Sequence, residues 1–310
     1  MPLIYSEDYN ISFLGIEKFH PFDSWKYKKV YDYLVDKANI PKTSFIQPKA
    51  LDDKLLLKVH TQRYLDSLNE PVNIARISEM YVLKNLPAMI LKNSLLNPMK
   101  LATSGTIMGA QLALTEGWAI NLSGGYHHAK SDEGGGFCFF ADIPLAIHII
   151  KEKHPMRKIV IIDLDAHQGN GIESIVKDDP WISIFDIYNK EIYPADYEAA
   201  AYIKYKFPVN SHIADEAYLA ILNKNLPEIL DVEQPELVIY NAGTDVFEGD
   251  PLGIMNITDK GIIKRDEIVF HETRSRKIPI LMVLSGGYTN RSGEVIGRSI
   301  ENLFRLKLIE

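Results

Sequence analysis

The sequence lacks the features that would place it in several large classes of protein. It has one cysteine, Cys138, among 310 residues, which excludes an internal disulfide and a zinc site built from cysteines. No apolar run approaches the ~18 residues that a membrane span needs. The first residues also show no basic stretch followed by an apolar one, as a signal peptide would. We therefore expect no membrane span and a cytoplasmic location, with nuclear and secreted locations left open.

An excess of positive charge is also absent. The chain carries 34 Lys and Arg against 41 Asp and Glu, a net charge of −7, which argues against direct nucleic-acid binding and is compatible with a cationic substrate. The hydrophobic fraction of 46% and the charged fraction of 24% are ordinary for a soluble globular protein. No linker, repeat or low-complexity segment divides the chain, so we expect one domain over residues 1–310. The oligomeric state is left open.

Apolar strand patterns alternate with helical ones from about residue 100 onward. This alternation predicts an α/β fold with a central, mostly parallel sheet and helices on both faces. The first 100 residues look mostly helical, with the clearest segments at 24–36 and 53–68. The expected strands are 118–122, 158–164, 182–187, 237–241 and 278–284. The expected helices are 102–116, 141–153, a short helix after Gly171, 215–231, 259–274 and 294–305.

Polar clusters rich in glycine, histidine, aspartate and tyrosine begin where the expected strands end. In an open parallel sheet, ligands bind at the carboxyl ends of the strands. We therefore expect these clusters to meet at one site. The clusters span residues 123–128, 163–167, 241–245 and 285–288.

One cluster predicts a metal site. Asp163, Asp165 and His167 alternate after an apolar run, and on a strand such positions point to the same side. Carboxylates that converge in a dry site repel each other, and a divalent cation relieves the repulsion. Aspartate oxygen with histidine nitrogen suits zinc, and Asp245 is expected as a third ligand. Asp250, which precedes a proline, is interpreted as a turn residue. The alternative for the cluster at residues 163–167 is a solvated strand end.

Two other clusters offer groups for acid–base and oxyanion chemistry. The adjacent His127 and His128 lie on a glycine-rich loop, where both side chains can face one cavity and act as a general acid/base pair. The alternative is a pair of surface or metal-binding histidines. Tyr288 follows two glycines at the end of an expected strand, a good place for a hydroxyl that donates to a developing oxyanion.

Together these motifs resemble those of the zinc-dependent histone deacetylases, and within them class IV. The resemblance covers nearly the whole chain and extends to residues 9–15, 22–23 and 59–65. It implies the arginase/deacetylase α/β fold and hydrolysis of the amide of acyl-lysine, acetyl or longer, on proteins or peptides. The motifs are Gly-Gly-Tyr-His-His-Ala-Lys-Ser-Asp-Glu-Gly-Gly-Gly-Phe-Cys (124–138), Asp-Leu-Asp-Ala-His-Gln-Gly-Asn-Gly (163–171), Tyr-Asn-Ala-Gly-Thr-Asp (240–245) and Ser-Gly-Gly-Tyr (285–288).

The resemblance assigns a role to each motif residue. It implies one catalytic zinc ion with three protein ligands, two catalytic histidines each paired with a partner, and a tyrosine that stabilises the transition state. The zinc ligands are Asp165, His167 and Asp245, and the catalytic residues are His127 with Asp163, His128 with Asn170, and Tyr288. Class I enzymes have an aspartate in place of Asn170, so we expect His128 to be less basic here than beside a carboxylate.

The resemblance also implies how the acyl-lysine is held. Phe137 and Tyr193 match the aromatic walls of a tunnel, Gly136 supplies a backbone carbonyl to it, and Tyr126 lies beside an inner pocket. The family also binds potassium near the zinc. That implication is weaker here because the segment 184–186 departs from the class I pattern.

Three alternatives remain beside the lysine deacylase. A ureohydrolase on the same fold uses two manganese ions and needs an aspartate where this chain has Gly169. An acetylpolyamine amidohydrolase shares every catalytic residue. A non-catalytic acyl-lysine binding module would be expected to lose a zinc ligand or the tyrosine, and this chain retains both.

Overall fold

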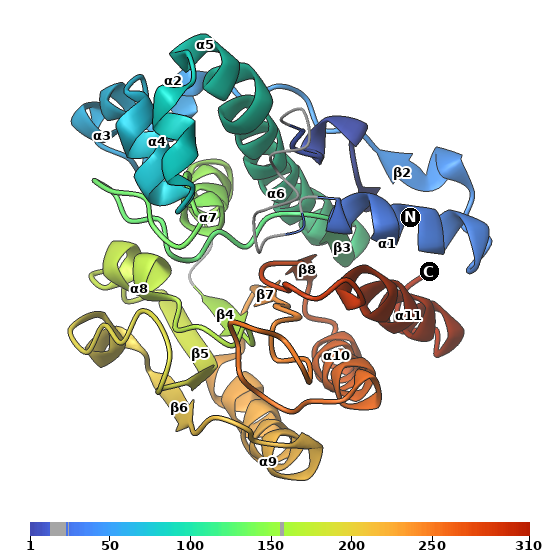
Figure 1. The fold of residues 1–310 in the computed structure, drawn as a ribbon. Helices are drawn as coiled ribbons and strands as arrows, with labels where there is room; N and C mark the ends of the chain where they lie inside the picture. The colour runs from blue at the N-terminus through green and yellow to red at the C-terminus, as the bar shows by residue number, and fades with distance from the viewer. Residues whose placement is uncertain (13–22, 24, 156–157) are drawn as a thin grey trace.

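Among the described residues, eight strands form a parallel sheet at the centre of the molecule. The computed structural model describes residues 1–12, 23, 25–155 and 158–310 (Figure 1). Every neighbouring pair of strands is parallel, in the order β2-β1-β3-β8-β7-β4-β5-β6. The strands are β1 Leu3–Ile4, β2 Phe45–Ile46, β3 Trp118–Asn121, β4 Ile159–Asp163, β5 Ile182–Asn189, β6 Tyr205–Val209, β7 Leu237–Asn241 and β8 Ile280–Val283.

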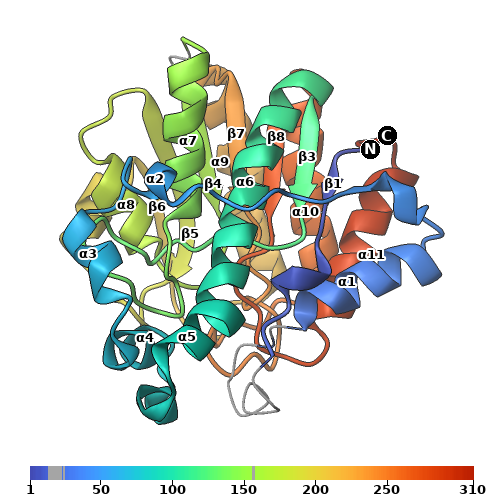
Figure 2. The same cartoon turned by 90° about the horizontal axis from the view of Figure 1, so that it is seen from above.

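Helices cover both faces of this sheet. α6 and α7 lie on one face, and α9, α10 and α11 lie on the other, with α1 packed beside α11 (Figures 1 and 2). The single α/β domain expected from the sequence is confirmed. The helices are α1 Lys26–Asp36, α2 Asp53–Leu56, α3 Gln62–Ser67, α4 Pro71–Ile77, α5 Ala88–Leu91, α6 Asn97–Glu116, α7 Asp142–Lys153, α8 Asn170–Val176, α9 Asp215–Glu233, α10 Asp259–Ser275 and α11 Ser292–Arg305.

The strands that precede the polar clusters are neighbours in the sheet. β3, β8, β7 and β4 lie side by side in that order, and each is buried along its whole length. Burial on both faces explains their continuous apolar runs. Asn121, Val283, Asn241 and Asp163 are paired across these strands, so the strands end at the same level. The loops that follow them gather at the lower edge of the sheet in Figure 2.

Three strands were not expected from the sequence. β1 and β2 are two residues long, too short for a periodic pattern. β6 forms one edge of the sheet and contains Pro208, which cannot donate to a strand ladder and is tolerated at an edge. The sequence pattern therefore missed β1 and β2 because they are short, and β6 because it contains a proline.

The helical segment expected at 53–68 is helical in its first and last parts and is interrupted between them. The segment forms two short helices, α2 and α3, because the chain between them is held to other parts of the molecule. The Thr61 backbone N–H donates to Ser131 O at 2.9 Å, and the Thr61 hydroxyl oxygen accepts from the Tyr64 N–H. The buried His60 accepts at Nε2 from the Ala141 N–H at 3.0 Å.

The N-terminal stretch that resembles class IV is described in part. The Tyr9 hydroxyl donates to Asn121 Oδ1 at 3.0 Å, which ties this stretch to the end of β3. Residues 13–22 lie outside the described residues.

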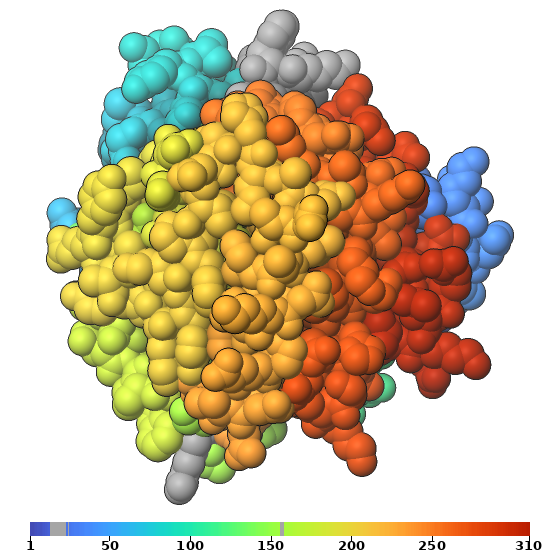
Figure 3. Space-filling model, turned by 90° about the horizontal axis from the view of Figure 1, so that it is seen from below, coloured from blue at the N-terminus to red at the C-terminus, as the bar shows by residue number. Residues whose placement is uncertain are grey.

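Figure 3 shows the face opposite that of Figure 2, where the later, yellow-to-red part of the chain covers most of the surface. Across the described ranges, we find no helix with the length and apolar character to cross a membrane.

A buried arginine joins two of the loops that carry the polar clusters. Arg265 of α10 is 1% exposed, and its guanidinium donates to Gly243 O at 2.6 Å and to Leu164 O at 3.2 Å. Its Nε donates to Asp266 Oδ1 at 2.9 Å. One side chain thus donates hydrogen bonds to carbonyls of the loops after β4 and β7. These carbonyls belong to residues that closely precede Asp165 and Asp245, two of the expected metal ligands, in the sequence.

Replacing this arginine should destabilise the whole domain. Arg265→Met removes the charge partner of buried Asp266 and leaves the loop carbonyls without a donor, so we expect a loss of about 3–5 kcal/mol in the free energy of unfolding. Denaturant titration measures it. Arg276→Met, which breaks a surface pair with Asp231, is the matched control and should cost far less. Equal losses in the two variants would contradict the role of Arg265.

Candidate active site

A narrow cavity lies at the carboxyl ends of the central strands, and most of the expected site residues line it. It is bounded by the loop after β3, the loop after β4 and the turn after β8. Its lining residues are Met99, Gly125, Tyr126, His127, His128, Gly136, Phe137, Cys138, Asp165, Ser285, Gly286 and Tyr288.

The three expected metal ligands form one buried group. The ligand atoms of Asp165, His167 and Asp245 all lie within 4.8 Å of one another. His167 Nδ1 is 3.1 Å from Asp165 Oδ1 and 2.8 Å from Asp245 Oδ2. The loops after β4 and β7 therefore bring together side chains that are far apart in the sequence.

Loop hydrogen bonds orient these ligands, and strand alternation does not. β4 ends at Asp163, so the expectation that positions 163, 165 and 167 share one side of a strand is wrong. Instead the Asp165 N–H donates to Asp163 Oδ1 at 3.2 Å, and the His167 N–H donates to Asp165 Oδ1 at 2.9 Å. The Ala166 N–H donates to Asp245 Oδ1 at 2.8 Å. Convergence thus comes from an irregular loop that follows the strand.

The group fits a divalent cation such as zinc. Burial and the nearby Asp165 raise the pKa of Asp245 to about 7, because two carboxylates are crowded together in a dry place. Gly286 leaves the space in front of them open: a Cβ there would lie 2.5 Å from Asp245 Oδ2 and 2.7 Å from Asp165 Oδ2. Two carboxylates and one imidazole match the ligand types of zinc and leave coordination positions for water and substrate.

The tandem histidines each contact the partner expected from the sequence. His127 Nδ1 lies 3.0 Å from Asp163 Oδ2, and Asn241 Nδ2 donates to the other oxygen of this carboxylate at 2.9 Å. His128 Nδ1 lies 2.9 Å from Asn170 Oδ1. The two imidazole rings are 4.1 Å apart between centroids. Both rings are buried and lie beside the metal-ligand group.

The environments of these histidines separate their pKa values. Burial alone would lower the pKa of His127, but the charges of Asp163 and Asp165 outweigh it and raise the pKa to about 9. Burial, together with the charge of His127, holds the pKa of His128 well below its ordinary value. His127 therefore has the higher pKa of the two, and His128 is the histidine whose surroundings favour the neutral form that can accept a proton.

The histidine loop is held by a residue that the sequence did not single out. Asp142 begins α7, and its carboxylate accepts from the Gly125 and Tyr126 N–H groups at 2.8 Å and from the Thr106 hydroxyl at 2.7 Å. Acidic residues are common in the first turn of a helix, so the sequence offers no special signal here. Tyr126, expected beside an inner pocket, lines the cavity, and its hydroxyl lies 3.2 Å from Ser123 Oγ.

Aromatic rings surround the approach to the histidines. The rings of Phe137 and Tyr288 are 6.0 Å apart between centroids, and the ring of Tyr193 is 4.9 Å from that of His128. Tyr193 is 49% exposed, so it lies at the mouth. Gly136 passes so close to His128 that a Cβ would meet its Cδ2 at 2.5 Å. The structure thus places together all four residues expected to contact substrate.

A buried lysine from α1 reaches the turn that carries Tyr288. Lys26 Nζ donates to Ser285 O at 2.6 Å and to Gly286 O at 2.9 Å, a contact between segments that no sequence pattern indicated. Burial lowers the pKa of Lys26 to about 8, although nearby aspartates oppose the shift. Burial, and then the charge of Asp245, holds the pKa of Tyr288 well above its ordinary value. The phenol therefore stays protonated and able to donate.

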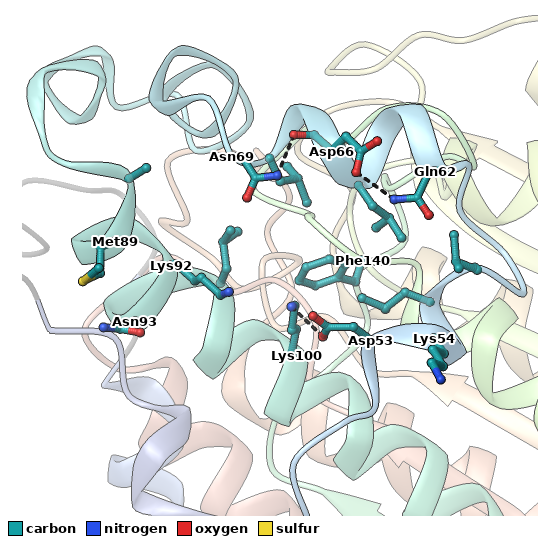
Figure 4. Close-up of a pocket in the computed structure, with 16 residues that line it drawn as sticks. Asp53, Lys54, Gln62, Asp66, Asn69, Met89, Lys92, Asn93, Lys100 and Phe140 are labelled. Atoms are coloured by element: carbon teal, nitrogen blue, oxygen red, sulfur yellow. Dashed lines mark hydrogen bonds and ion pairs between the residues drawn. The ribbon is translucent and has the colours of Figure 1, made fainter.

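A larger hollow lies elsewhere, between α2, α3, α5 and the π-helical segment Lys92–Leu96 (Figure 4). None of the expected site residues lines it. Asp53 and Lys100 form an ion pair of 2.6 Å across it, and the Gln62 amide donates to Asp66 at 2.7 Å. Two of its charged groups, Asp53 and Lys100, are thus paired with each other, and the hollow lacks the converging histidines and carboxylates of the cavity above the sheet.

Removing one carboxylate should abolish metal binding. Asp165→Ala deletes one of three ligands, so we expect wild-type protein to retain one zinc ion per chain after dialysis and the variant to retain none. Elemental analysis of the purified proteins measures this, with Asp259→Ala, at a surface ion pair with Arg298, as the control. Two tightly bound divalent ions per wild-type chain would contradict a single-ion site.

Comparisons with known proteins identify the family of this chain. Residues 20–305 match the family model described as histone deacetylase domain. Histone deacetylase 2 of Arabidopsis thaliana is 46% identical over 308 residues, which cover 99% of this chain and 80% of that protein. Histone deacetylase 1 of Homo sapiens is 28% identical over 290 residues, which cover 88% of this chain and 58% of that protein.

A solved structure shares the fold. The crystal structure of the HDA15 HD domain has a TM-score of 0.78 with this chain and covers 99% of it and 89% of that domain, at 19% identity. At this identity the likeness shows the fold alone. The family-model match and the identity to the plant protein show the family: the chain belongs to the histone deacetylase family.

Proposed function

We propose that the chain is a zinc-dependent lysine deacylase of class IV, which hydrolyses the amide of acyl-lysine in proteins or peptides. The family and the fold support a deacetylase function. One observation supports the finer proposal most directly: the loop of His128 and the turn of Tyr288 border one cavity beside the Asp165–His167–Asp245 group. Asn170, as in class IV, contacts His128. The potassium ion that the resemblance implies stays a prediction.

His128 is the proposed general base and acid. Zinc, held by Asp165, His167 and Asp245, would polarise the acyl carbonyl and lower the pKa of a water molecule. His128 is neutral and its Nδ1 contacts Asn170, so its Nε2 is the atom that takes the proton from water. The same nitrogen then returns this proton to the departing lysine amine.

His127 and Tyr288 stabilise the charge that develops on the acyl oxygen. His127 is held protonated beside Asp163 and supplies a fixed positive charge. The protonated phenol of Tyr288 donates a hydrogen bond to the oxyanion, an interaction that strengthens as negative charge builds. Phe137 and Tyr193 enclose the apolar stem of the lysine and exclude water.

The ureohydrolase alternative is disfavoured by the backbone as well as by the residue type. A Cβ on Gly169 would lie 2.7 Å from Asp163 Oδ2, so an aspartate does not fit at this position without movement. An acetylpolyamine amidohydrolase would turn over a different substrate, and a non-catalytic binding module would turn over none. One turnover experiment therefore separates both alternatives from the proposal.

Turnover on matched substrates tests the proposal. One peptide with acetyl-, butyryl-, octanoyl- or myristoyl-lysine is compared with an acetylated polyamine, using wild-type protein and Tyr288→Phe. We expect wild-type turnover of acyl-lysine peptide and a loss of ~10² or more in the variant, because an oxyanion donor is removed. Zinc content should not change. Turnover of the polyamine alone would support that alternative, and absence of all turnover would support the binding module.

The pH–rate profile should respond to the residue beside His128. Asn170→Asp places a carboxylate at Nδ1, which favours the imidazolium and raises the pKa of His128. Because the base must be neutral to act, the acidic limb of the profile should move to higher pH. Steady-state rates between about pH 5 and 9, with zinc content checked at each end, measure this. An unmoved acidic limb would show that another group controls it.

A further inference from the structure

We propose that Asp250 is a positioning residue for Tyr288, with a role beyond that of a turn residue. The proposal rests on the deacylase function, in which Tyr288 donates to the oxyanion. Asp250 lies in the loop after β7 and is 4% exposed. Nothing in the motif pattern assigns it a part in the reaction.

The two oxygens of the Asp250 carboxylate have separate partners. Oδ1 accepts from the Leu252 N–H at 3.0 Å and the Gly253 N–H at 3.1 Å, which is the local bonding expected of aspartate in a turn. Oδ2 accepts from the backbone N–H of Tyr288 at 2.8 Å, across 38 residues of sequence. The local bonds account for the turn, and the long-range bond joins this loop to the turn after β8.

This long-range bond fixes the point from which the Tyr288 side chain starts. The preceding part of the turn is already held, because Lys26 binds the carbonyls of Ser285 and Gly286. Between that part and Tyr288 lies Gly287 at a φ of 134°, a backbone conformation open mainly to glycine. Only Gly287, whose backbone is flexible, therefore separates the carbonyls bound by Lys26 from Tyr288. The hydrogen bond to Asp250 restricts the backbone position of Tyr288.

A small displacement of the phenol is enough to matter. An oxyanion donor acts only at hydrogen-bond distance from the developing charge, and a misplacement of about 1 Å can cost ~10²-fold in rate. A change at Asp250 should thus act on turnover through Tyr288, although the carboxylate touches neither substrate nor zinc.

Asp250→Asn removes the long-range bond and keeps the local ones. The amide oxygen can still accept from Leu252 and Gly253, but the NH₂ group then faces the N–H of Tyr288, and two donors cannot pair. Asp250→Ser, which loses the long-range acceptor in another way, serves as the second variant if Asp250→Asn fails to fold. Asp215→Asn is the matched control, because Asp215 joins two segments through Thr258 N–H and hydroxyl at a distance from the cavity.

Kinetics in two backgrounds test the proposal. Asp250→Asn should lower kcat by ~10- to 10²-fold with KM within about twofold and zinc content unchanged. In a Tyr288→Phe background the same substitution should lower kcat by less than about twofold, because the hydroxyl that it misplaces is already gone. Asp215→Asn should leave kcat near wild type. A full, multiplicative loss in the Tyr288→Phe background, or wild-type kcat in Asp250→Asn, would overturn the proposal.

A second measurement is independent of turnover and separates this proposal from the proposed function. In protein labelled with fluorotyrosine, the ¹⁹F resonance of Tyr288 is identified by its loss in Tyr288→Phe. It should shift or broaden in Asp250→Asn and stay in place in Asp215→Asn. An unchanged resonance in Asp250→Asn would overturn the positioning role even if the chain turned over no acyl-lysine. A wild-type enzyme without turnover would instead count against the deacylase function alone.

Discussion

The burial of negative charge is the constraint on which the rest of the structure depends. Asp163, Asp165 and Asp245 lie at the ends of two neighbouring strands, and each is 1% exposed or less. Buried carboxylates are tolerated only where donors and opposite charges surround them. The loops supply backbone N–H groups, the histidines supply imidazole nitrogens, and Lys26 and Arg265 hold the carbonyls of the turns behind. Close packing of loops over the strand ends explains why glycine is required at Gly243 and Gly286, where any side chain would meet these carboxylates.

The position of the site within the sheet follows from the order of the strands. Each polar cluster could be located from the sequence, because a buried parallel strand reads as an apolar run and its end is visible where polar residues begin. That β8 lies between β3 and β7 could not, since strand order depends on tertiary packing and leaves no local pattern. The structure shows that the strands carrying chemistry are consecutive across the sheet, and this adjacency lets Asn241 contact Asp163.

Residues that support the site were harder to predict than residues that form it. Asp142 looks like an ordinary acid at the start of a helix, Lys26 like a polar position in a helix, and Asp250 like a turn residue. Each acts through a partner distant in sequence, and for Lys26 and Ser285 the separation is 259 residues. Local patterns report propensity and periodicity, so a contact of this kind has no signature in a single sequence. The motif residues were found because several unusual residue types stand together.

The place of β8 in the sheet has a consequence for how the chain folds. β8 follows every other strand along the chain, yet it lies in the middle of the sheet, with β3 on one side and β7 on the other. Trp118 pairs with Ile280, so the two halves of the sheet are joined by a contact of long sequence separation, whose loop-closure entropy slows folding. Until β8 inserts, β3 and β7 each present an open edge of unpaired backbone groups, the kind of surface on which partly folded chains associate. A newly synthesised chain is therefore most exposed to aggregation just before its last strand is in place.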